Sequence, residues 1–372
     1  MSDQAAPGPF EVGRRVWRRL LPLVVVCLFY FGVLVYPILR IWSLLAGSVP
    51  GTPTLLVIMV GPLLARLAHE FYPGTLTRWL SAVAFTWLGI CFMAFLLVLA
   101  FEIARLLIPL ADFTWGAILA GLLGAFTVYA FVNAQRLLVR EISIPAPAPL
   151  AGRRLAQISD VHVGSRSGAF LNRVVRRVNA LEPDYVLITG DLIDFRDISR
   201  EELASLGTLT APSYFIIGNH ERYVDVEAIC ERLSSLGVNV LRNQTVSVDG
   251  MQLIGIDDAE PKTQVGQVLK SLTPDPDAFR ILLYHRPDGA EDAARWGAEL
   301  MLCGHTHNGQ IVPFNFIVRR VFPHIQGLYE IGALKLYVSP GTGTWGPVLR
   351  LGSRSEVTVI TLSASSDGQD TP

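Results

Sequence analysis

The first 150 residues contain four long stretches without a charged side chain, and this feature limits the possible folds more than any other. A helix needs about 20 apolar residues to cross a hydrocarbon core of about 30 Å. We therefore expect four membrane-spanning helices. In the second stretch, glycine and proline residues predict a turn at 41–52, followed by a helix at 53–69. The four stretches are 20–39, 41–65, 79–101 and 113–135.

Charged residues are unevenly distributed along the chain. Residues 1–150 contain 16 of them, whereas residues 151–372 contain 47. The whole chain is only 17% charged, against about 25% in ordinary soluble domains. The net charge of −1 gives no argument for a nucleic-acid partner. We therefore expect a first part that lies in a lipid bilayer and a second part that lies in water.

The basic residues at the ends of the four stretches predict a topology. Ten arginines fall before the first span, between the second and third spans, or after the fourth, whereas only Arg40 and Arg105 fall in the other two connections. The positive-inside rule then places the N-terminus and residues 141–372 in the cytoplasm. The expected location is a multi-pass position in the inner or plasma membrane. A signal peptide beginning at Arg14 and Arg15 is the alternative, and three further spans argue against its cleavage.

Composition also predicts the domain boundaries. The segment 143–152 reads SIPAPAPLAG, and its alternating prolines are typical of a stiff spacer. The last residues are small and polar, as in disordered tails. The expected domains are a basic cytoplasmic tail at 1–19, a four-helix transmembrane region at 20–142, a linker at 143–152, a soluble domain at 153–364 and a disordered tail at 365–372.

The second part of the chain alternates short apolar runs with amphipathic segments. Runs such as 185–189 and 280–284 predict strands, and 170–181 predicts a helix with Leu171 and Val174 on its apolar face. Alternating strands and helices indicate a layered α/β domain. Because the last third is richer in strand, we expect two packed sheets, in an α/β/β/α order, rather than one parallel sheet.

Five clusters of ionisable or amide residues follow the predicted strands. Ligands bind at the carboxyl ends of strands in open α/β sheets, so we expect the clusters to share one crevice. Aspartate, asparagine and histidine donors without a thiolate suit Mn, Fe, Zn or Co. The donors are too many for one ion, and a pair of ions needs a bridging carboxylate, for which Asp191 is the natural candidate. The clusters lie at 160–162, 190–194, 218–221, 285 and 304–307.

The order D-x-H, G-D-x-x-D, G-N-H-E, H and G-H-x-H resembles the calcineurin-like metallophosphoesterase superfamily, over roughly 153–362. The resemblance implies a phosphoester hydrolase with two divalent metal ions. It also implies that His220 protonates the leaving group and that Asp194 accepts a hydrogen bond from this imidazole and orients it. The implied ligands are Asp160, His162, Asp191 and His307 for the first ion, and Asp191, Asn219, His285 and His305 for the second.

Four segments narrow the resemblance further: SDVHVG, YHRPD, GHTHNGQI and YVSPGTGTWGPVLRLG. They resemble a membrane-associated bacterial branch with proteins similar to UDP-2,3-diacylglucosamine hydrolases and broad phosphodiesterases. Four spans would hold the site near a bilayer, so a lipid-linked phosphodiester or pyrophosphate is the favoured substrate. One alternative is a broad phosphatase or nucleotide phosphodiesterase that is merely localised to the membrane. The other is a non-catalytic metal-binding sensor or scaffold, against which the full ligand set and His220 argue.

The remaining residues near the clusters have less specific interpretations. Arg222 and Arg286 adjoin ligands and are candidates for binding the substrate phosphate, with solvated arginines as an equal alternative. Glu221 is interpreted as structural, in contact with backbone. The segment 314–320 contains aromatic and basic residues that suit lipid headgroups, but we expect a solvated loop.

Overall fold

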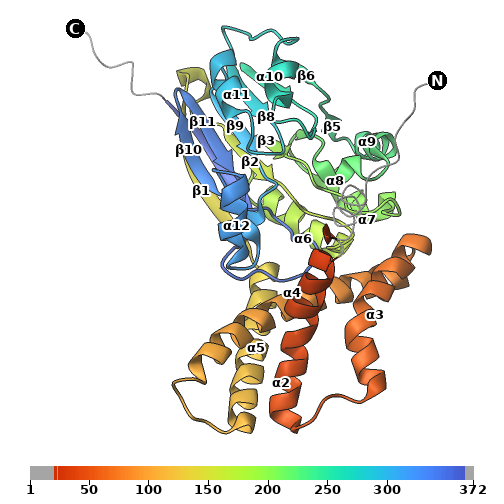
Figure 1. Ribbon diagram of the computed structural model, residues 1–372. Coiled ribbons are helices and arrows are strands. Elements are labelled where there is room, and N and C mark those ends of the chain that lie inside the picture. Colours follow the sequence, from red (N-terminus) through yellow and green to blue (C-terminus); the bar gives the residue numbers. More distant parts are fainter. Residues whose placement is uncertain (1–20, 23, 365–372) are drawn as a thin grey trace, which may run out of the picture. The chain divides into compact units, whose positions relative to one another are not determined.

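The computed structural model describes residues 21–22 and 24–364. The chain divides into two compact units, 1–128 and 129–372. The division falls within helix α5 (Asp112–Gln135), so the last residues of this helix belong to the second unit. Figure 1 shows the elements of each unit. The predicted tails at 1–19 and 365–372 lie outside the described residues.

The first unit is built from apolar helices, and the prediction of four long apolar helices is confirmed. Within residues 21–22 and 24–364, four helices are long and apolar enough to cross a membrane: Val24–Ala46, Thr52–Phe71, Thr75–Ala104 and Asp112–Gln135. The first contains a π-helical stretch, η1 (Tyr30–Val35), and α2 (Tyr36–Ala46), and the next two are α3 (Thr52–Phe71) and α4 (Thr75–Ala104).

The prediction of a turn at 41–52 was wrong about where the turn begins. Helix α2 continues to Ala46, and Gly47 ends it with a φ of 65°. Glycine adopts this left-handed conformation without the steric cost that a side chain brings, which is why it commonly follows the last turn of a helix. Residues 41–46 contain no glycine or proline and extend the helix instead.

The second unit contains two six-stranded sheets, which confirms the predicted two-sheet α/β domain. The first sheet consists, in order, of β1 (Leu137–Ala146), β12 (Ser355–Ala364), β2 (Arg154–Ile158), β3 (Tyr185–Ile188), β4 (Ser213–Phe215) and β5 (Asn239–Val240). The second consists of β10 (Gly327–Ile331), β11 (Leu334–Val338), β9 (Leu300–Cys303), β8 (Phe279–Leu283), β7 (Met251–Gly255) and β6 (Gln244–Val248).

Apolar side chains bury both faces of each sheet, and β2 illustrates how. Leu155 belongs to the core between the two sheets, whereas its neighbours Ala156 and Ile158 belong to the core that the first sheet shares with its helices. Successive strand residues point to opposite faces, so a strand covered on both sides is mostly apolar; the buried Gln157 of β2 is an exception whose side chain is hydrogen-bonded to Thr189 and Cys303. The helices of this unit are α6 (Gly168–Asn179), α7 (Arg200–Leu203), α8 (Asn219–Arg222), α9 (Val226–Ser235), α10 (Gln264–Leu269), α11 (Ala290–Trp296) and α12 (Phe314–Val321).

The segment expected to be a proline-rich spacer is strand up to Ala146. β1 pairs in parallel with β12 along its whole length, and Ile144 is buried. Pro145 is compatible with this pairing because β1 is an edge strand, where a missing N–H costs no bond to a second neighbour. A 3-10 turn, η2 (Ala148–Leu150), follows. The expectation of a free spacer was therefore wrong for 143–146.

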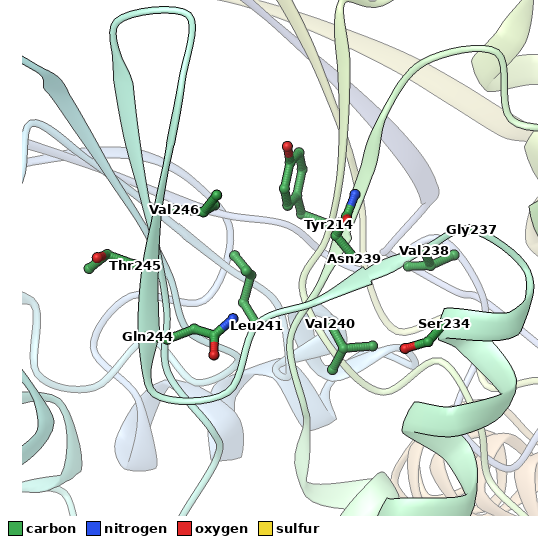
Figure 2. A pocket seen from close by; sticks show the side chains of 10 residues that line it. All are labelled: Tyr214, Ser234, Gly237, Val238, Asn239, Val240, Leu241, Gln244, Thr245 and Val246. Atoms are coloured by element: carbon green, nitrogen blue, oxygen red, sulfur yellow. The ribbon is translucent and has the colours of Figure 1, made fainter.

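The strand directions bring the predicted clusters to one edge of each sheet. β2, β3 and β4 are mutually parallel neighbours in the first sheet, and β7, β8 and β9 are in the second. The carboxyl ends of these strands therefore share an edge. A separate cavity of about 420 Å³ lies between β5 and β6, with Tyr214 and Val246 among its lining residues (Figure 2). None of its ten lining residues is a predicted site residue.

Candidate metal centre

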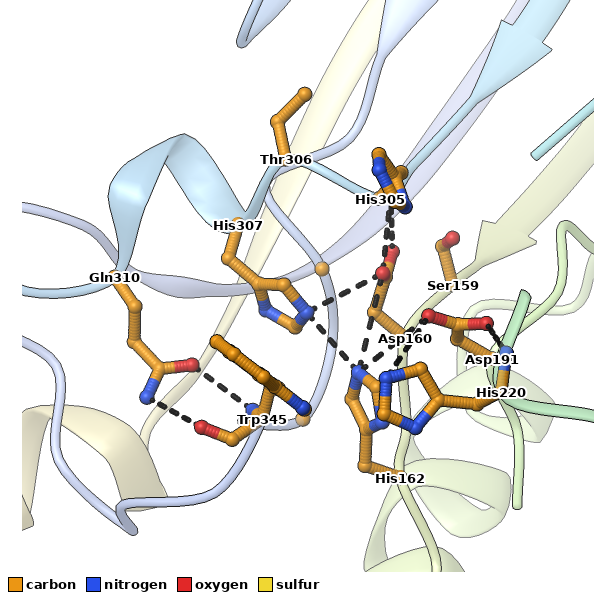
Figure 3. A network of polar contacts seen from close by, with 12 residues as sticks. Ser159, Asp160, His162, Asp191, His220, His305, Thr306, His307, Gln310 and Trp345 are labelled. Atoms are coloured by element: carbon orange, nitrogen blue, oxygen red, sulfur yellow. Dashed lines mark hydrogen bonds and ion pairs between the residues drawn. The ribbon is translucent and has the colours of Figure 1, made fainter. Parts of the chain in front are cut away.

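The first group of candidate ligands follows β2 and β9. His307 Nε2 lies 3.3 Å from Asp160 Oδ1 and 3.0 Å from His162 Nε2 (Figure 3). All three side chains are buried, and their ligand atoms are close enough together to hold one metal ion. Two imidazole nitrogens that face each other in a dry site suit a shared cation, because a neutral ring nitrogen offers its lone pair to a metal.

The second group follows β3, β8 and β9. Asp191 Oδ2 lies 3.1 Å from His285 Nε2, and His285 Nε2 lies 3.2 Å from His305 Nδ1. These three residues form another cluster that could hold an ion. Asp191 Oδ2 also lies 4.0 Å from His162 Nε2 in the first group. One carboxylate oxygen therefore stands between the two groups.

Asn219 offers an independent test of whether a cation fits. Its side chain is buried, and Oδ1 has no hydrogen-bond partner among the described residues. An unpaired buried carbonyl oxygen costs about 1–3 kcal/mol, so a native structure seldom keeps one without a partner. Asn219 begins α8, separated by three residues from the end of β4 at Phe215, at the edge where Asp191 lies. The donor set thus fits a divalent ion on the Asp191 side.

The backbone of this region is held in a rarely adopted conformation. Asp160, His162, Asp191, His305 and His307 have φ between 49° and 74°. For residues other than glycine, this left-handed region costs on the order of 1–3 kcal/mol and is found mainly at functional sites. Five of the seven candidate ligands share this strain. The fold therefore accepts a local loss of stability where these side chains are directed toward one another.

Glycines let the strand ends approach one another closely. A Cβ built on Gly218 would lie 2.2 Å from Asp191 Oδ1, and one on Gly304 would lie 2.2 Å from Asp160 Oδ2. Any side chain at these two positions would therefore displace a candidate ligand. This explains why each of the corresponding clusters contains a glycine.

His220 and His162 share one carboxylate. Asp194 Oδ1 lies 2.7 Å from His220 Nδ1 and 2.6 Å from His162 Nδ1. The Asp194–His220 contact agrees with the predicted partnership, whereas the contact with His162 was not predicted. His220 Nε2 then lies 3.9 Å from Asp191 Oδ2, and the ring also forms a possible ligand group with His162 and Asp191.

The electrostatic surroundings give the histidines of this region different pKa values. Burial lowers the pKa of His220, but the hydrogen bond to Asp194 and the charge of Asp191 outweigh it and raise this pKa to about 9. The pKa of His305 falls to about 3, because of burial and of the neighbouring His285. Burial and the neighbouring His162 also lower the pKa of His307. At neutral pH His220 therefore carries a proton, while His305 and His307 keep a free lone pair.

Glu221 is structural, as predicted. Its carboxylate accepts hydrogen bonds from the backbone N–H groups of Asp191, Leu192, Ile193 and Gly218. These bonds join the turn after β3 to the turn after β4 and so fix the position of Asp191. The N–H of His220 adds a bond of 2.9 Å to Asp191 Oδ1.

The two predicted phosphate-binding arginines are already engaged. Arg222 Nη1 lies 2.9 Å from Asp258 Oδ2, and Arg286 Nε lies 2.6 Å from Asp258 Oδ1. Both guanidinium groups also contact Glu260 at 3.2 Å. Two carboxylates thus balance two cations in this structure, and phosphate binding by Arg222 and Arg286 stays a prediction. No motif in the sequence singles out Asp258 and Glu260, which lie outside the five clusters.

Arg350 is a third residue whose role could not be predicted from the sequence. It is fully buried, and its Nη2 lies 3.3 Å from His307 Nδ1 and donates to the carbonyls of Pro340 and Gly343 at 2.8 and 2.7 Å. The side chain therefore holds the loop after β11 against a candidate ligand. It belongs to the VLRLG segment, but no spacing rule links it to His307.

Comparison with known proteins agrees with this geometry. The family profile described as "Calcineurin-like phosphoesterase" matches residues 153–309. A Danio rerio protein, "Transmembrane protein with metallophosphoesterase domain", is 33% identical over 93% of this chain and 90% of its own length. The Bos taurus protein of the same name is 36% identical over 64% of this chain and 60% of its own length.

Bacterial relatives are found as well. An uncharacterized metallophosphoesterase of Campylobacter jejuni is 30% identical over 72% of this chain and 78% of its own length. Because relatives come from vertebrates as well as bacteria, the likeness is not particular to the bacterial branch that the sequence segments suggested. The length of the match with the Danio rerio protein includes the apolar helices, so the chain is a membrane protein with a metal-dependent hydrolase domain. The chain belongs to the calcineurin-like metallophosphoesterase family.

Proposed function

We propose that this protein hydrolyses a phosphodiester or pyrophosphate bond with a pair of divalent cations. Asp160, His162 and His307 would hold one ion, His285, His305 and Asn219 would hold the other, and Asp191 would contact both. The observation that carries the proposal is the position of Asp191 Oδ2, 3.1 Å from His285 Nε2 and 4.0 Å from His162 Nε2. Nitrogen and oxygen donors without thiolate favour Mn, Fe, Zn or Co over softer ions.

The protein residues have distinct tasks in this reaction. When bound, a pair of divalent cations polarises a phosphoryl oxygen and makes an attacking water more acidic. Asp194 holds His220 through Nδ1, which leaves Nε2 facing the cluster. The Asp194 carboxylate stabilises the protonated form of this imidazole and so raises its pKa, which favours a proton on His220 for the leaving oxygen. Glu221 keeps Asp191 in place through its four backbone bonds.

The proposed substrate is a lipid-linked phosphoester, of the kind found in UDP-2,3-diacylglucosamine. Four apolar helices anchor the chain, so its hydrolase domain works next to a lipid surface. The test compares product formation from UDP-diacylglucosamine, phospholipids and nucleotides by purified full-length protein in lipid. Faster cleavage of a lipid substrate than of any soluble nucleotide, with release of UMP from UDP-diacylglucosamine or of a phosphorylated headgroup from a phospholipid, supports the proposal. Preference for a soluble nucleotide would replace it with a membrane-localised nucleotide phosphodiesterase.

A simpler assay separates catalysis from mere metal binding. Metal-dependent hydrolysis of bis-p-nitrophenyl phosphate by the full chain, and its loss in Asp191→Asn, is the expected result. The matched control is Asp277→Asn, since Asp277 is exposed and lies outside the cluster. A protein that binds metal but is inactive toward every ester tested would be a sensor or scaffold.

The proposed orientation puts the hydrolase domain in the cytoplasm, with the spans in the inner or plasma membrane. The support is the arginine distribution, ten on one side against two on the other. A reporter fused after Pro372 and another at the N-terminus should both behave as cytoplasmic. An exported C-terminal reporter would instead favour the signal-peptide alternative.

A further inference from the structure

Helix α12 exposes an apolar face that no other described part of the chain covers. The segment expected to be a solvated loop is instead this helix, and none of its eight residues is buried. Phe316, Ile317 and Val321 lie within about 140° of one another around the helix, at about 100° per residue, and therefore share one side. Phe316 is 62% exposed, Ile317 56% and Val321 54%. We call these three side chains the α12 face. Isolated exposed apolar residues are ordinary, but a contiguous group marks an interaction surface.

Two cations accompany the α12 face. Arg319 and Arg320 occupy the last turn of the helix, and both are exposed. Neither forms an ion pair with any residue that the structure describes. Their charge is therefore free for a partner outside the chain. Aromatic and aliphatic residues on one side with arginines beside them are the composition of helices that lie in the interface of a membrane.

The end of α5 shows where a membrane meets this unit. The Arg350 N–H donates to the Ala130 carbonyl at 2.9 Å. Asn133 Nδ2 donates to the carbonyls of Arg350 and Ser353 at 2.9 and 2.8 Å. The last turns of the fourth candidate span are thus bonded into the loop 350–353. A helix that crosses a bilayer ends at its surface, so this loop lies near the headgroups.

The same loop is bonded to the start of α12. The Val312 N–H donates to the Leu351 carbonyl at 2.8 Å, and the Leu351 N–H donates to the Gln310 carbonyl at 3.0 Å. Gln310 and Val312 lie just ahead of α12. The end of α5 and the start of α12 are therefore attached to adjacent residues of one short loop, inside one compact unit.

We propose that the α12 face lies in the headgroup region of the bilayer that α5 crosses, with Arg319 and Arg320 against anionic lipid phosphates. Lipid fits this face better than a second copy of the chain, because the face is next to the end of a membrane span and carries unpaired positive charge. An interfacial helix buries its apolar side about 5–10 Å into the boundary between headgroups and acyl chains. The proposal does not depend on the substrate or on catalysis.

The position of α12 has a consequence for the metal centre. Phe322 follows the helix, and its ring centroid lies 5.1 Å from that of His305. Trp345, which is exposed, has its ring centroid 6.4 Å from that of His220. An α12 that rests on lipid therefore holds the candidate ligands close to headgroup level, where the phosphate of an amphiphile lies.

The test measures the depth of a label on α12. The full chain carries Phe316→Cys in a Cys27→Ser, Cys230→Ser background; the two remaining cysteines, Cys91 and Cys303, are buried. A nitrobenzoxadiazole label at position 316 is followed in vesicles of phosphatidylcholine and phosphatidylglycerol with doxyl-labelled lipids. We expect a blue-shifted emission and stronger quenching by a doxyl group near the headgroup than by one deep in the acyl chain.

Controls make each outcome decisive. Ser271→Cys places the label just after α10, at the end of the unit away from α12 (Figure 1), and should not be quenched. Ile317→Cys is a second position if the first variant fails to fold. Replacing phosphatidylglycerol by phosphatidylcholine, or introducing Arg319→Glu with Arg320→Glu, should weaken the quenching. A label at 316 that behaves like the one at 271 overturns the proposal. A blue shift without lipid quenching overturns it in favour of a protein partner.

Discussion

The two units of this protein use the same apolar residues in opposite ways. In the first unit Val57 on α3 is 69% exposed, whereas in the second unit Leu187 on β3 is fully buried between two sheets. In the four candidate spans, only 6–33% of the most apolar window is buried within the protein. Lipid takes the place of a protein core around the first unit. In the first unit, an apolar residue indicates contact with lipid. In the second unit, an apolar residue indicates burial in the protein core.

The two units also differ in their charged residues, because the second unit buries several of them. The second unit buries Asp160, Asp191, Glu221 and Arg350. Each of these side chains has several named partners, since an unpaired buried charge costs several kcal/mol. Single substitutions should therefore have large effects at these positions and small effects on the lipid-facing surface. The predictions below test this contrast, beginning with the largest effect.

Asp191→Asn should abolish hydrolysis. The substitution removes the negative charge that faces both ligand groups, so both should bind metal more weakly. We expect activity to fall to background, and elemental analysis to show a decrease from about two ions to at most one. A variant with two ions and a normal rate would show that Asp191 does not bridge.

His220→Ala should lower the rate without removing metal. For a poor leaving group the loss should be about 10²–10⁴-fold, the usual contribution of a general acid. For p-nitrophenolate, which needs little protonation, the loss should be clearly smaller. Both rates are measured on protein whose metal content is determined in parallel. Equal losses for the two leaving groups would exclude the acid role, and loss of an ion would make His220 a ligand.

Asp194→Asn should have a milder effect, on both the hydrolysis rate and the affinity for metal. The carboxylate contacts His220 and also His162, so it supports both the proton donor and a candidate ligand. Removing a carboxylate that supports a metal ligand typically costs about 10–100-fold in affinity or activity. We expect the leaving-group pattern of His220→Ala, together with weaker metal binding in a titration. Unchanged metal affinity would restrict the role of Asp194 to His220.

Metal affinity should also depend on pH. Without metal, burial lowers the pKa of His285, but the charge of Asp191 outweighs burial and raises this pKa to about 10. His285 is therefore protonated below about pH 10, and a metal must displace this proton. Affinity should fall about tenfold for each pH unit by which the solution becomes more acidic. Competition titrations with a chelator at pH values one unit apart measure this slope, and a flat profile would show that His285 is not a ligand.

The sequence predicted well which candidate ligands lie close together, because these residues follow the ends of parallel strands. Asp160, Asp191 and His285 are far apart in the chain, but each follows an apolar run, and parallel pairing brings such ends together. The sequence could not predict the pairing of Arg222 and Arg286 with Asp258, because that contact depends on the path of a loop. It also could not separate an exposed loop from helix α12, which no core residue anchors.

Local composition misled the prediction at the start of the second unit. Three prolines at alternate positions indicated a spacer, but β12 supplies a complete edge to which β1 can add. Tertiary pairing overrides local preference in strands more readily than in helices. In the first unit the spans were predicted from hydropathy alone. One predicted boundary was displaced because Gly47 ends helix α2, whereas the prediction placed the turn over the whole segment 41–52 that contains the glycine and proline residues.

The smallest effect is expected for Leu56→Ala on α3. Leu56 is 56% exposed within the protein and faces lipid in the proposed topology, so the substitution leaves no cavity. Stability should change by about 0.5 kcal/mol or less. The matched substitution Leu187→Ala empties space between two sheets and should cost about 2–5 kcal/mol. Thermal unfolding of the two variants in the same lipid, with hydrolysis of bis-p-nitrophenyl phosphate as a second readout, compares them directly. Similar losses for both would mean that α3 packs against protein at Leu56, and the contrast between the units would not hold there.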